Sequence, residues 1–368
     1  MISKVYIDQA VEKSPVTQSI LKRLGCEDVQ VVSDRQRLER HLRDVADPIG
    51  QGKQTLFLTE NKGPFIKKCP GTKSYLCCGY QILNIGTYCT MDCAYCILQA
   101  YFHPPVLQYF VNQERLFDEL DELLGRKPVP FHRIGTGEFT DSLIWEPWTG
   151  LSRKLVLRFG EQERMVLELK TKTADVQNLE GLPHNKKTVM AWSVNPSKII
   201  QTEERRTSSI RARLEAAAQC ERWGYPLAFH FDPLILYEDW EDDYRRLIGD
   251  MFQSVSPENV VWVSLGSFRF MPSLKPIVQR RFPRSKIIYG EFITGLDGKM
   301  RYFKPLRIHL YQKIVAWIRD VAPQVGIYFC MEDESVWEKT LGMVPERVGG
   351  LPRMLDEWAA RHCGIEIE

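Results

Sequence analysis

Three closely spaced cysteines carry the strongest chemical signal in the chain. They lie in YCTMDCAYCILQ (residues 88–99), where Cys89, Cys93 and Cys96 have the spacing C-x3-C-x2-C. Three thiolates can hold three irons of a [4Fe–4S] cluster, and the lack of a fourth cysteine leaves one iron open, as in a catalytic zinc site. An open iron can bind S-adenosylmethionine (SAM), and one electron then yields methionine and a 5′-deoxyadenosyl radical.

Two other interpretations of these cysteines stay open. They could form a structural zinc site completed by Cys77, Cys78 or a histidine, or they could be loop cysteines without a ligand. Ten cysteines in 368 residues do not suggest a secreted disulfide scaffold. Because the triplet directly follows a predicted strand and is more specific than a lone CxxC, it favours an iron–sulfur cluster.

Alternating strand and helix patterns from about residue 80 onward must position this loop. Helical patterns lie between the strands, at 111–126, 208–224 and 239–255. Six such units predict an α/β fold with a parallel sheet, either curled into a partial barrel or doubly wound. The apolar runs that predict the strands lie at 80–86, 131–137, 165–171, 188–195, 226–235 and 259–267.

The two ends of the chain have different patterns from the middle. A helix at 36–47 and a strand at 54–60 indicate an α/β extension before the barrel. After it, 286–307 predicts a hairpin around GLDG, followed by a helix at 306–321 and a strand at 326–330. The expected regions are an N-terminal extension (1–75), the barrel (76–270) and a C-terminal region (271–368).

The overall composition is nearly neutral. The formal net charge is +2, so any contact with nucleic acid must come from a local patch. No secretory h-region is visible, and no apolar run approaches the roughly 20 residues that span a bilayer. We therefore expect a cytoplasmic monomer without membrane contact.

The cysteine spacing, its place after the first strand and the βα alternation resemble the radical SAM superfamily. The resemblance covers about 80–270 and implies a partial (β/α)6 TIM-like barrel with the cluster at its carboxyl mouth. It implies that Tyr95, just before the third cysteine, lies near the adenine. It also implies that Gly135, Gly137 and Glu138, in GTGEFTDS, contact the methionine amino group.

Other candidate SAM contacts lie at strand ends. Lys172 follows the third predicted strand, and Ser193 and Asn195 end the fourth. Their shared position fits contacts to the carboxylate and ribose of SAM, although each alone is typical of a solvated loop residue.

A second set of motifs resembles the spore photoproduct lyase family over nearly the whole chain. That resemblance implies a DNA repair lyase acting on 5-thyminyl-5,6-dihydrothymine, a UV-induced thymine dimer, by removing a hydrogen atom from C6. A reductant such as flavodoxin or ferredoxin would supply the electron. The motifs are CPGT (69–72), GYQILNIGTYCTMDCAYCILQ (79–99), TSSIRARLEAA (207–217), RRFPRSK (280–286) and MRYFKP (300–305).

Such a lesion must leave the base stack, which requires aromatic side chains and cations that hold the strand. Two basic runs near the predicted hairpin offer both. Judged by charge alone, such runs are usually solvated. The predicted DNA contacts are Arg280, Arg281, Lys299, Arg301, Tyr302 and Lys304.

Two departures from the family pattern concern the return of hydrogen to the product. Members that repair spore DNA commonly carry a donor cysteine in the loop after the second strand, but GTGEFTDS has none. They also tend to have a tyrosine after the third cluster cysteine, where this chain has Ile97. Tyr95 remains a catalytic candidate, and Cys77 or Cys78 could replace the donor, unless both are simply buried small apolar residues.

These departures keep two alternative functions open. One is a radical SAM enzyme on the same scaffold with a different substrate. The other is a nucleic-acid-binding protein with a structural metal site and no turnover.

Overall fold

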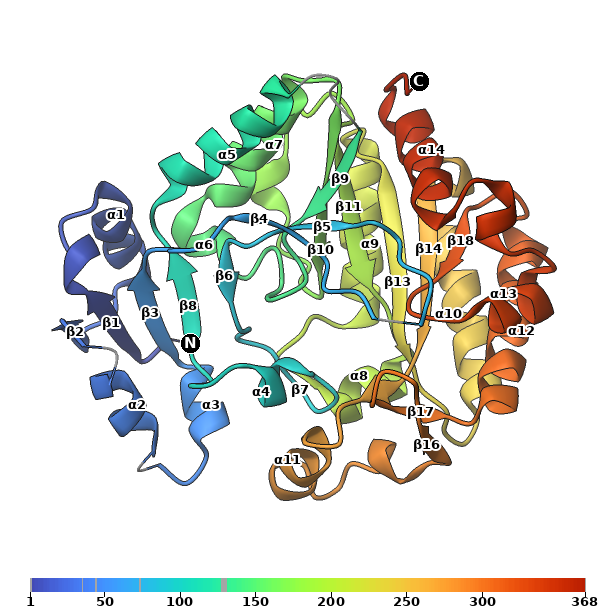
Figure 1. Ribbon diagram of the computed structural model, residues 1–368, viewed down its shortest axis with the longest axis horizontal. Helices are drawn as coiled ribbons and strands as arrows, with labels where there is room; N and C mark the ends of the chain where they lie inside the picture. Colours follow the sequence, from blue (N-terminus) through green and yellow to red (C-terminus); the bar gives the residue numbers. More distant parts are fainter. Residues whose placement is uncertain (1, 35, 44, 73, 127–130, 368) are drawn as a thin grey trace.

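An eight-stranded sheet curls through the centre of the protein (Figure 1). The computed structural model describes residues 2–367 apart from 35, 44, 73 and 127–130. Neighbouring strands are parallel except for β4, which runs antiparallel to β5 at one edge. In spatial order the strands are β18 (Ile327–Phe329), β14 (Val260–Ser267), β13 (Leu227–Leu234), β11 (Thr188–Ser193), β10 (Met165–Thr171), β9 (His132–Gly135), β5 (Gln81–Leu83) and β4 (Ile66–Lys68).

The six predicted strands are confirmed as β5, β9, β10, β11, β13 and β14. They lie side by side in chain order, without the reversal that a doubly wound sheet requires. The partial barrel is therefore the correct alternative, and β18 adds a seventh parallel strand to it.

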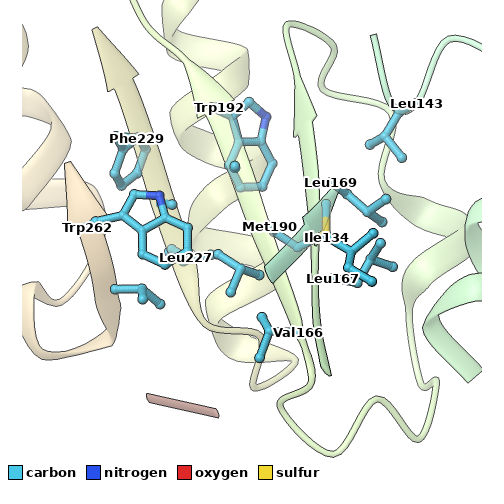
Figure 2. Close-up of a cluster of buried hydrophobic side chains, with 14 of the residues drawn as sticks. Ile134, Leu143, Val166, Leu167, Leu169, Met190, Trp192, Leu227, Phe229 and Trp262 are labelled. Atoms are coloured by element: carbon cyan, nitrogen blue, oxygen red, sulfur yellow. The ribbon is translucent and has the colours of Figure 1, made fainter. Parts of the chain in front are cut away.

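Apolar and polar residues alternate in the second half of β10. Leu167 and Leu169 point outward into the apolar core of Figure 2, under the covering helices. Glu168, between them, meets His230 of β13 at 2.8 Å although β11 separates the two strands. Only a concave inner face allows that contact, so the polar residues line the inside of the barrel.

Helices cover the convex face of the sheet (Figure 1). The predicted helices at 111–126, 208–224 and 239–255 are confirmed as α5, α9 and α10. Ser209 caps α9 by accepting a hydrogen bond from the backbone N–H of Ala212. The covering helices are α5 (Gln113–Gly125), α7 (Leu151–Gly160), α9 (Ile210–Arg222), α10 (Trp240–Ser254), α12 (Lys304–Val321) and α14 (Leu351–Cys363).

A second, five-stranded sheet stands beside the barrel (Figure 1). The predicted strand at 54–60 is β3, and the predicted helix at 36–47 is α2 (Gln36–Arg43), with residue 44 outside the described residues. β6 and β8 belong to this sheet, so it is not confined to the first 75 residues, and the three-region division stays a prediction. Its strands are β2 (Val29–Val32), β1 (Lys4–Asp8), β3 (Thr55–Thr59), β8 (Leu107–Phe110) and β6 (Gly86–Thr87).

The predicted hairpin is confirmed as β16 (Phe292–Thr294) and β17 (Met300–Tyr302), which are antiparallel. β15 (Arg269–Phe270) pairs with β17 to complete a small third sheet, and α11 (Leu274–Arg281) lies between β15 and the hairpin in sequence. The helix and strand predicted at 306–321 and 326–330 are α12 and β18. No helix in the described part of the chain is long and apolar enough to span a membrane.

Candidate active site at the carboxyl mouth of the barrel

The cysteine loop connects β6 to β8 and lies at the carboxyl mouth of the barrel. Within it, Cys93 pairs with Glu204 across the short antiparallel ladder of β7 (Asp92–Cys93) and β12 (Glu204–Arg205). β12 follows β11, and the Tyr88 N–H donates to the Phe139 carbonyl at 2.8 Å in the loop after β9. The loop is thus held against the carboxyl ends of two barrel strands.

Cys89, Cys93 and Cys96 pack in one small group with Met91 and Ile144. Burial raises the pKa of Cys89 to about 12, so this thiol keeps its proton until a metal displaces it. In the described residues, no three Cys, His, Asp or Glu side chains converge tightly enough to hold one metal ion.

Lys53 supports this loop from beneath. Its buried ammonium donates to the carbonyls of Cys89 at 3.1 Å and Met91 at 2.5 Å, and lies 3.9 Å from Asp92. It also lies 4.6 Å from the centre of the Tyr88 ring. A single buried cation therefore fixes the backbone between the first two cysteines.

Arg281 braces the other side of the loop. Its guanidinium, on a side chain only 6% exposed, pairs with Asp92 at 2.8 Å and with Asp47 at 2.9 Å. It also donates to the side-chain carbonyl of Gln99, whose amide donates to the carbonyl of Cys93 at 3.0 Å. Arg281 thus has a structural position here instead of the predicted contact with DNA.

Tyr95 anchors a buried network next to the cluster loop. Its hydroxyl donates to Glu204, which also accepts from the Asn195 amide at 2.9 Å and pairs with Arg213 at 2.6 Å. The exposed fraction of the Glu204 and Arg213 side chains is 0%. Arg213 also donates to the Ser193 carbonyl at 2.8 Å. The structure thus brings together Tyr95, Ser193 and Asn195, three predicted contacts of SAM.

The glycines of the predicted SAM loop are required by close packing. A Cβ atom at Gly135 would lie 1.6 Å from the Tyr80 hydroxyl oxygen, and one at Gly137 would lie 2.9 Å from Cβ of Lys170. Asp141 fixes the end of this loop by accepting from the Lys172 N–H at 2.8 Å and from the Thr171 hydroxyl at 2.8 Å.

Charged side chains inside the barrel face this loop. Burial opposes charge on Lys170, but the carboxylates of Glu138, Glu168 and Asp232 raise its pKa. Asp232 forms a 3.2 Å ion pair with Arg269, and Lys172 lies 5.8 Å from the centre of the Tyr95 ring. Glu138 thus lies within electrostatic reach of Lys170, and Lys172 lies over the ring of Tyr95.

The segment 69–80, which carries Cys77 and Cys78, bridges the two edges of the barrel. Its Cys69 N–H donates to the Tyr80 carbonyl at 2.9 Å next to β5, and its Leu76 N–H donates to the Glu332 carbonyl at 3.1 Å beyond β18. Arg133 of β9 donates to the Cys78 carbonyl.

The pKa values of the two adjacent thiols shift in opposite directions. A hydrogen bond with Cys78 lowers the pKa of Cys77, while the same contact, with burial, raises the pKa of Cys78. Cys77 is exposed, whereas Cys78 is half-buried.

The remaining predicted DNA contacts separate into buried and exposed residues. Arg301 is buried in a 2.7 Å ion pair with Asp297, and Tyr302 is buried with its hydroxyl accepting from the Leu236 N–H at 3.1 Å. Lys299 lies 3.6 Å from Asp297 with its side chain 16% exposed. The two cations thus pair with Asp297 of the hairpin, and the uncharged Tyr302 is held by its backbone partner.

Arg280 and Lys304 keep accessible positions. Arg280 is exposed on α11, and Lys304, 42% exposed at the start of α12, pairs with Asp333 at 2.9 Å. The basic surface is thus smaller than the sequence suggests.

Comparison with known proteins agrees with this site. The family model of spore photoproduct lyase matches residues 70–305, which include Cys89, Cys93 and Cys96 and both predicted SAM-binding strand ends. The chain belongs to the spore photoproduct lyase family. It is therefore a radical SAM lyase by family, and the resemblance seen in the sequence is confirmed.

Relatives in the spore photoproduct lyase family match most of the chain. The spore photoproduct lyase of Clostridium acetobutylicum is 24% identical over 307 residues, which cover 83% of this chain and 87% of that protein. The spore photoproduct lyase of Bacillus subtilis is 28% identical over 239 residues, covering 63% of this chain and 68% of the relative.

Solved spore photoproduct lyase structures share the fold. A double mutant with bound AdoMet and dinucleoside spore photoproduct aligns with a TM-score of 0.77 and 21% identity, covering 89% of this chain and 99% of that one. A second structure, complexed with dinucleoside spore photoproduct, aligns with a TM-score of 0.76 and 20% identity over the same shares.

Sequence reasoning missed several supporting residues of this family member. Arg213 lies inside the TSSIRARLEAA motif and Glu204 just before it, so the motif gave a signal for their region. Asp92 lies inside the cysteine motif, but nothing in the sequence indicated its pairs with Lys53 and Arg281. Lys53 gave no signal, because an isolated charge does not reveal a partner far along the chain.

Proposed function

We propose that this chain repairs a thymine-dimer lesion of the spore photoproduct type in DNA. The observation that carries the proposal is the buried cysteine loop at the barrel mouth, within a family match over 70–305. Cys89, Cys93 and Cys96 would hold a [4Fe–4S] cluster, which when bound supplies the electron that cleaves SAM to methionine and a 5′-deoxyadenosyl radical.

The chain's own residues bind and orient SAM in this proposal. Glu138 would accept hydrogen bonds from the methionine amino group, and Lys172 would neutralise the methionine carboxylate. Gly135 and Gly137 would hold the loop against Tyr80 and Lys170, because neither position has room for a side chain. Tyr95 would border the adenosine with its ring fixed by Glu204.

Ser193 and Asn195 form the ribose side of this proposed site. Both are buried at the end of β11, and the Asn195 amide is oriented by Glu204 at 2.9 Å and by the Tyr244 hydroxyl at 3.0 Å. Such second contacts limit the rotamers of the side chain that meets the ligand.

Hydrogen return would come from the Cys77 and Cys78 pair. A hydrogen donor must carry an S–H bond, and the raised pKa of Cys78 favours the protonated thiol there. The segment that carries it crosses the open side of the barrel, between β5 and the end of β18. The pair would replace the donor cysteine that GTGEFTDS lacks.

Lesion turnover tests the proposal. The reconstituted protein, incubated without oxygen with SAM, dithionite and a lesion-bearing oligonucleotide, should release thymine repair product together with 5′-deoxyadenosine. The Cys77→Ser/Cys78→Ser double variant should still cleave SAM but lose repaired thymine, whereas Cys220→Ser, a buried cysteine of α9, should behave as wild type. An intact lesion despite SAM cleavage by the wild type would contradict the repair function and favour another radical SAM substrate.

The partners follow from the same proposal. DNA would meet the exposed cations Arg280 and Lys304, and a flavodoxin or ferredoxin would supply the electron. With DNA as substrate, we place the protein in the cytoplasm as a monomer.

A further inference from the structure

Three aromatic side chains form a patch beside the cluster loop that no part of the proposed SAM site uses. Tyr101 ends the short helix α4 (Leu98–Tyr101), which begins two residues after Cys96, and Phe102 follows it. Phe139 comes from GTGEFTDS, on the loop after β9. The patch therefore joins the two loops that border the mouth of the barrel.

The rings hold one another in fixed orientations. Tyr101 and Phe139 are nearly parallel, with an angle of 11° and centroids 6.3 Å apart. Phe102 meets Tyr101 edge-on at 5.2 Å and Phe139 at 6.1 Å. The Phe139 loop is itself tied to the cluster loop through the Tyr88 N–H. An aromatic ring oriented in this way loses little conformational entropy when a flat ligand stacks on it.

The patch is nevertheless open to solvent. Tyr101 is 57% exposed, and Ile97, one turn before it, is 37% exposed. Ala100, the residue before Tyr101, instead packs against the apolar group that includes Leu274 and Val278 of α11. Because the large aromatic ring of Tyr101 is exposed to water here, one face of that ring can contact a partner.

The charges around the patch favour nucleic acid as that partner. Residues 97–102, ILQAYF, carry no charge, so the patch itself offers nothing to an acidic redox protein. Next to it, α11 and the residues after it present the exposed cations Arg280, Arg284 and Lys286. An uncharged aromatic platform flanked by cations is the arrangement that binds single-stranded nucleic acid.

We propose that Tyr101, with Phe102 and Phe139, forms a stacking platform for an unpaired DNA base beside the lesion. The phosphates of that strand would lie along the cations of α11. This inference rests on the proposed function, in which the lesion leaves the helical stack, and it adds a site for a neighbouring base. Stacking needs no specific base, because every base presents a π face.

Substitutions at Tyr101 test the platform. The probe is a single-stranded oligonucleotide carrying 2-aminopurine, whose fluorescence is quenched when the base stacks on an aromatic ring. Tyr101→Ala should weaken binding by about 10-fold, the effect typical of one lost base–aromatic stack, and should abolish the quench. Tyr101→Phe should keep both the wild-type affinity and the fluorescence quench. Tyr101→Leu, which retains apolar area without a ring, should lose the quench.

Matched controls separate this inference from general damage and from the repair proposal. Val348→Ala, at another exposed apolar side chain, should bind as wild type. Equal affinity and quench in Tyr101→Ala and wild type would overturn the platform. The platform would also be overturned if Tyr101→Ala bound DNA as wild type but cleaved SAM more slowly with flavodoxin as reductant, because the patch would then dock a protein. A wild-type chain that binds and quenches the probe but leaves the lesion intact would contradict the repair proposal alone.

Discussion

Lys53→Met should loosen the cluster loop without unfolding the protein. Methionine has nearly the length of lysine and no charge, so the variant removes the ammonium and keeps the packing. Two carbonyls, of Cys89 and Met91, then lose their buried donor. An unsatisfied buried acceptor costs about 1–3 kcal/mol, so losing the donor to both carbonyls should cost the ordered loop about 2–6 kcal/mol relative to its open state. Asp92 keeps its 2.8 Å pair with Arg281.

A chelator assay measures this loss. An opening free energy lower by about 3 kcal/mol corresponds to roughly a 100-fold larger open population. Reconstituted Lys53→Met should therefore release iron to a chelator roughly 100-fold faster than wild type when release follows loop opening. Lys198→Met makes the same chemical change on a half-exposed side chain and should leave the rate unchanged. Iron release from Lys53→Met at the wild-type rate would refute the role of Lys53.

Three further predictions concern the barrel. Glu204→Ala leaves the guanidinium of Arg213 buried without a charge partner and should lower the free energy of unfolding by about 3–5 kcal/mol, measured by thermal unfolding. Adding Arg213→Met should recover much of that loss, and no recovery would argue against a buried ion pair. Gly135→Ala places a Cβ 1.6 Å from the Tyr80 hydroxyl oxygen and should lower both the melting temperature and SAM affinity by calorimetry, with partial rescue by Tyr80→Phe. Burial disfavours the Glu168 carboxylate, but His230 more than offsets this and lowers the pKa of Glu168 to about 2, below its usual 4.5. The Glu168–His230 pair therefore stabilises the fold fully above about pH 4.5, and this stabilisation is lost as the pH falls toward 2. Denaturant unfolding from pH 6 to 3 should show a steeper decline for wild type than for Glu168→Gln, and equal slopes would count against the pair.

The barrel could be predicted because its strands are buried on both faces and therefore have apolar runs in the sequence. The βα alternation predicted a parallel sheet, but the choice between a barrel and a doubly wound sheet needed the spatial order of the strands. The two-residue strand β6 has no pattern of its own, so nothing indicated that the cysteine loop leaves the five-stranded sheet.

The candidate site was predictable where local spacing decides the chemistry. Cys89, Cys93 and Cys96 are close in sequence and remain close in the fold. Arg281 and Arg301 looked like solvated cations because they stand in basic runs, yet both are buried by carboxylates. The partner of Arg281, Asp92, lies 189 residues away, and such distant pairs leave no local signal.

Iron content and SAM cleavage in a triple cysteine variant test the central claim most directly. Anaerobically reconstituted wild type should bind about four irons per chain, as a [4Fe–4S] cluster requires, and form 5′-deoxyadenosine from SAM and dithionite. Replacing Cys89, Cys93 and Cys96 by alanine should abolish both, while alanine at Cys26, Cys220 and Cys363, which lie outside the cluster loop, should preserve both. A cluster loop variant that still binds four irons and cleaves SAM would contradict the account.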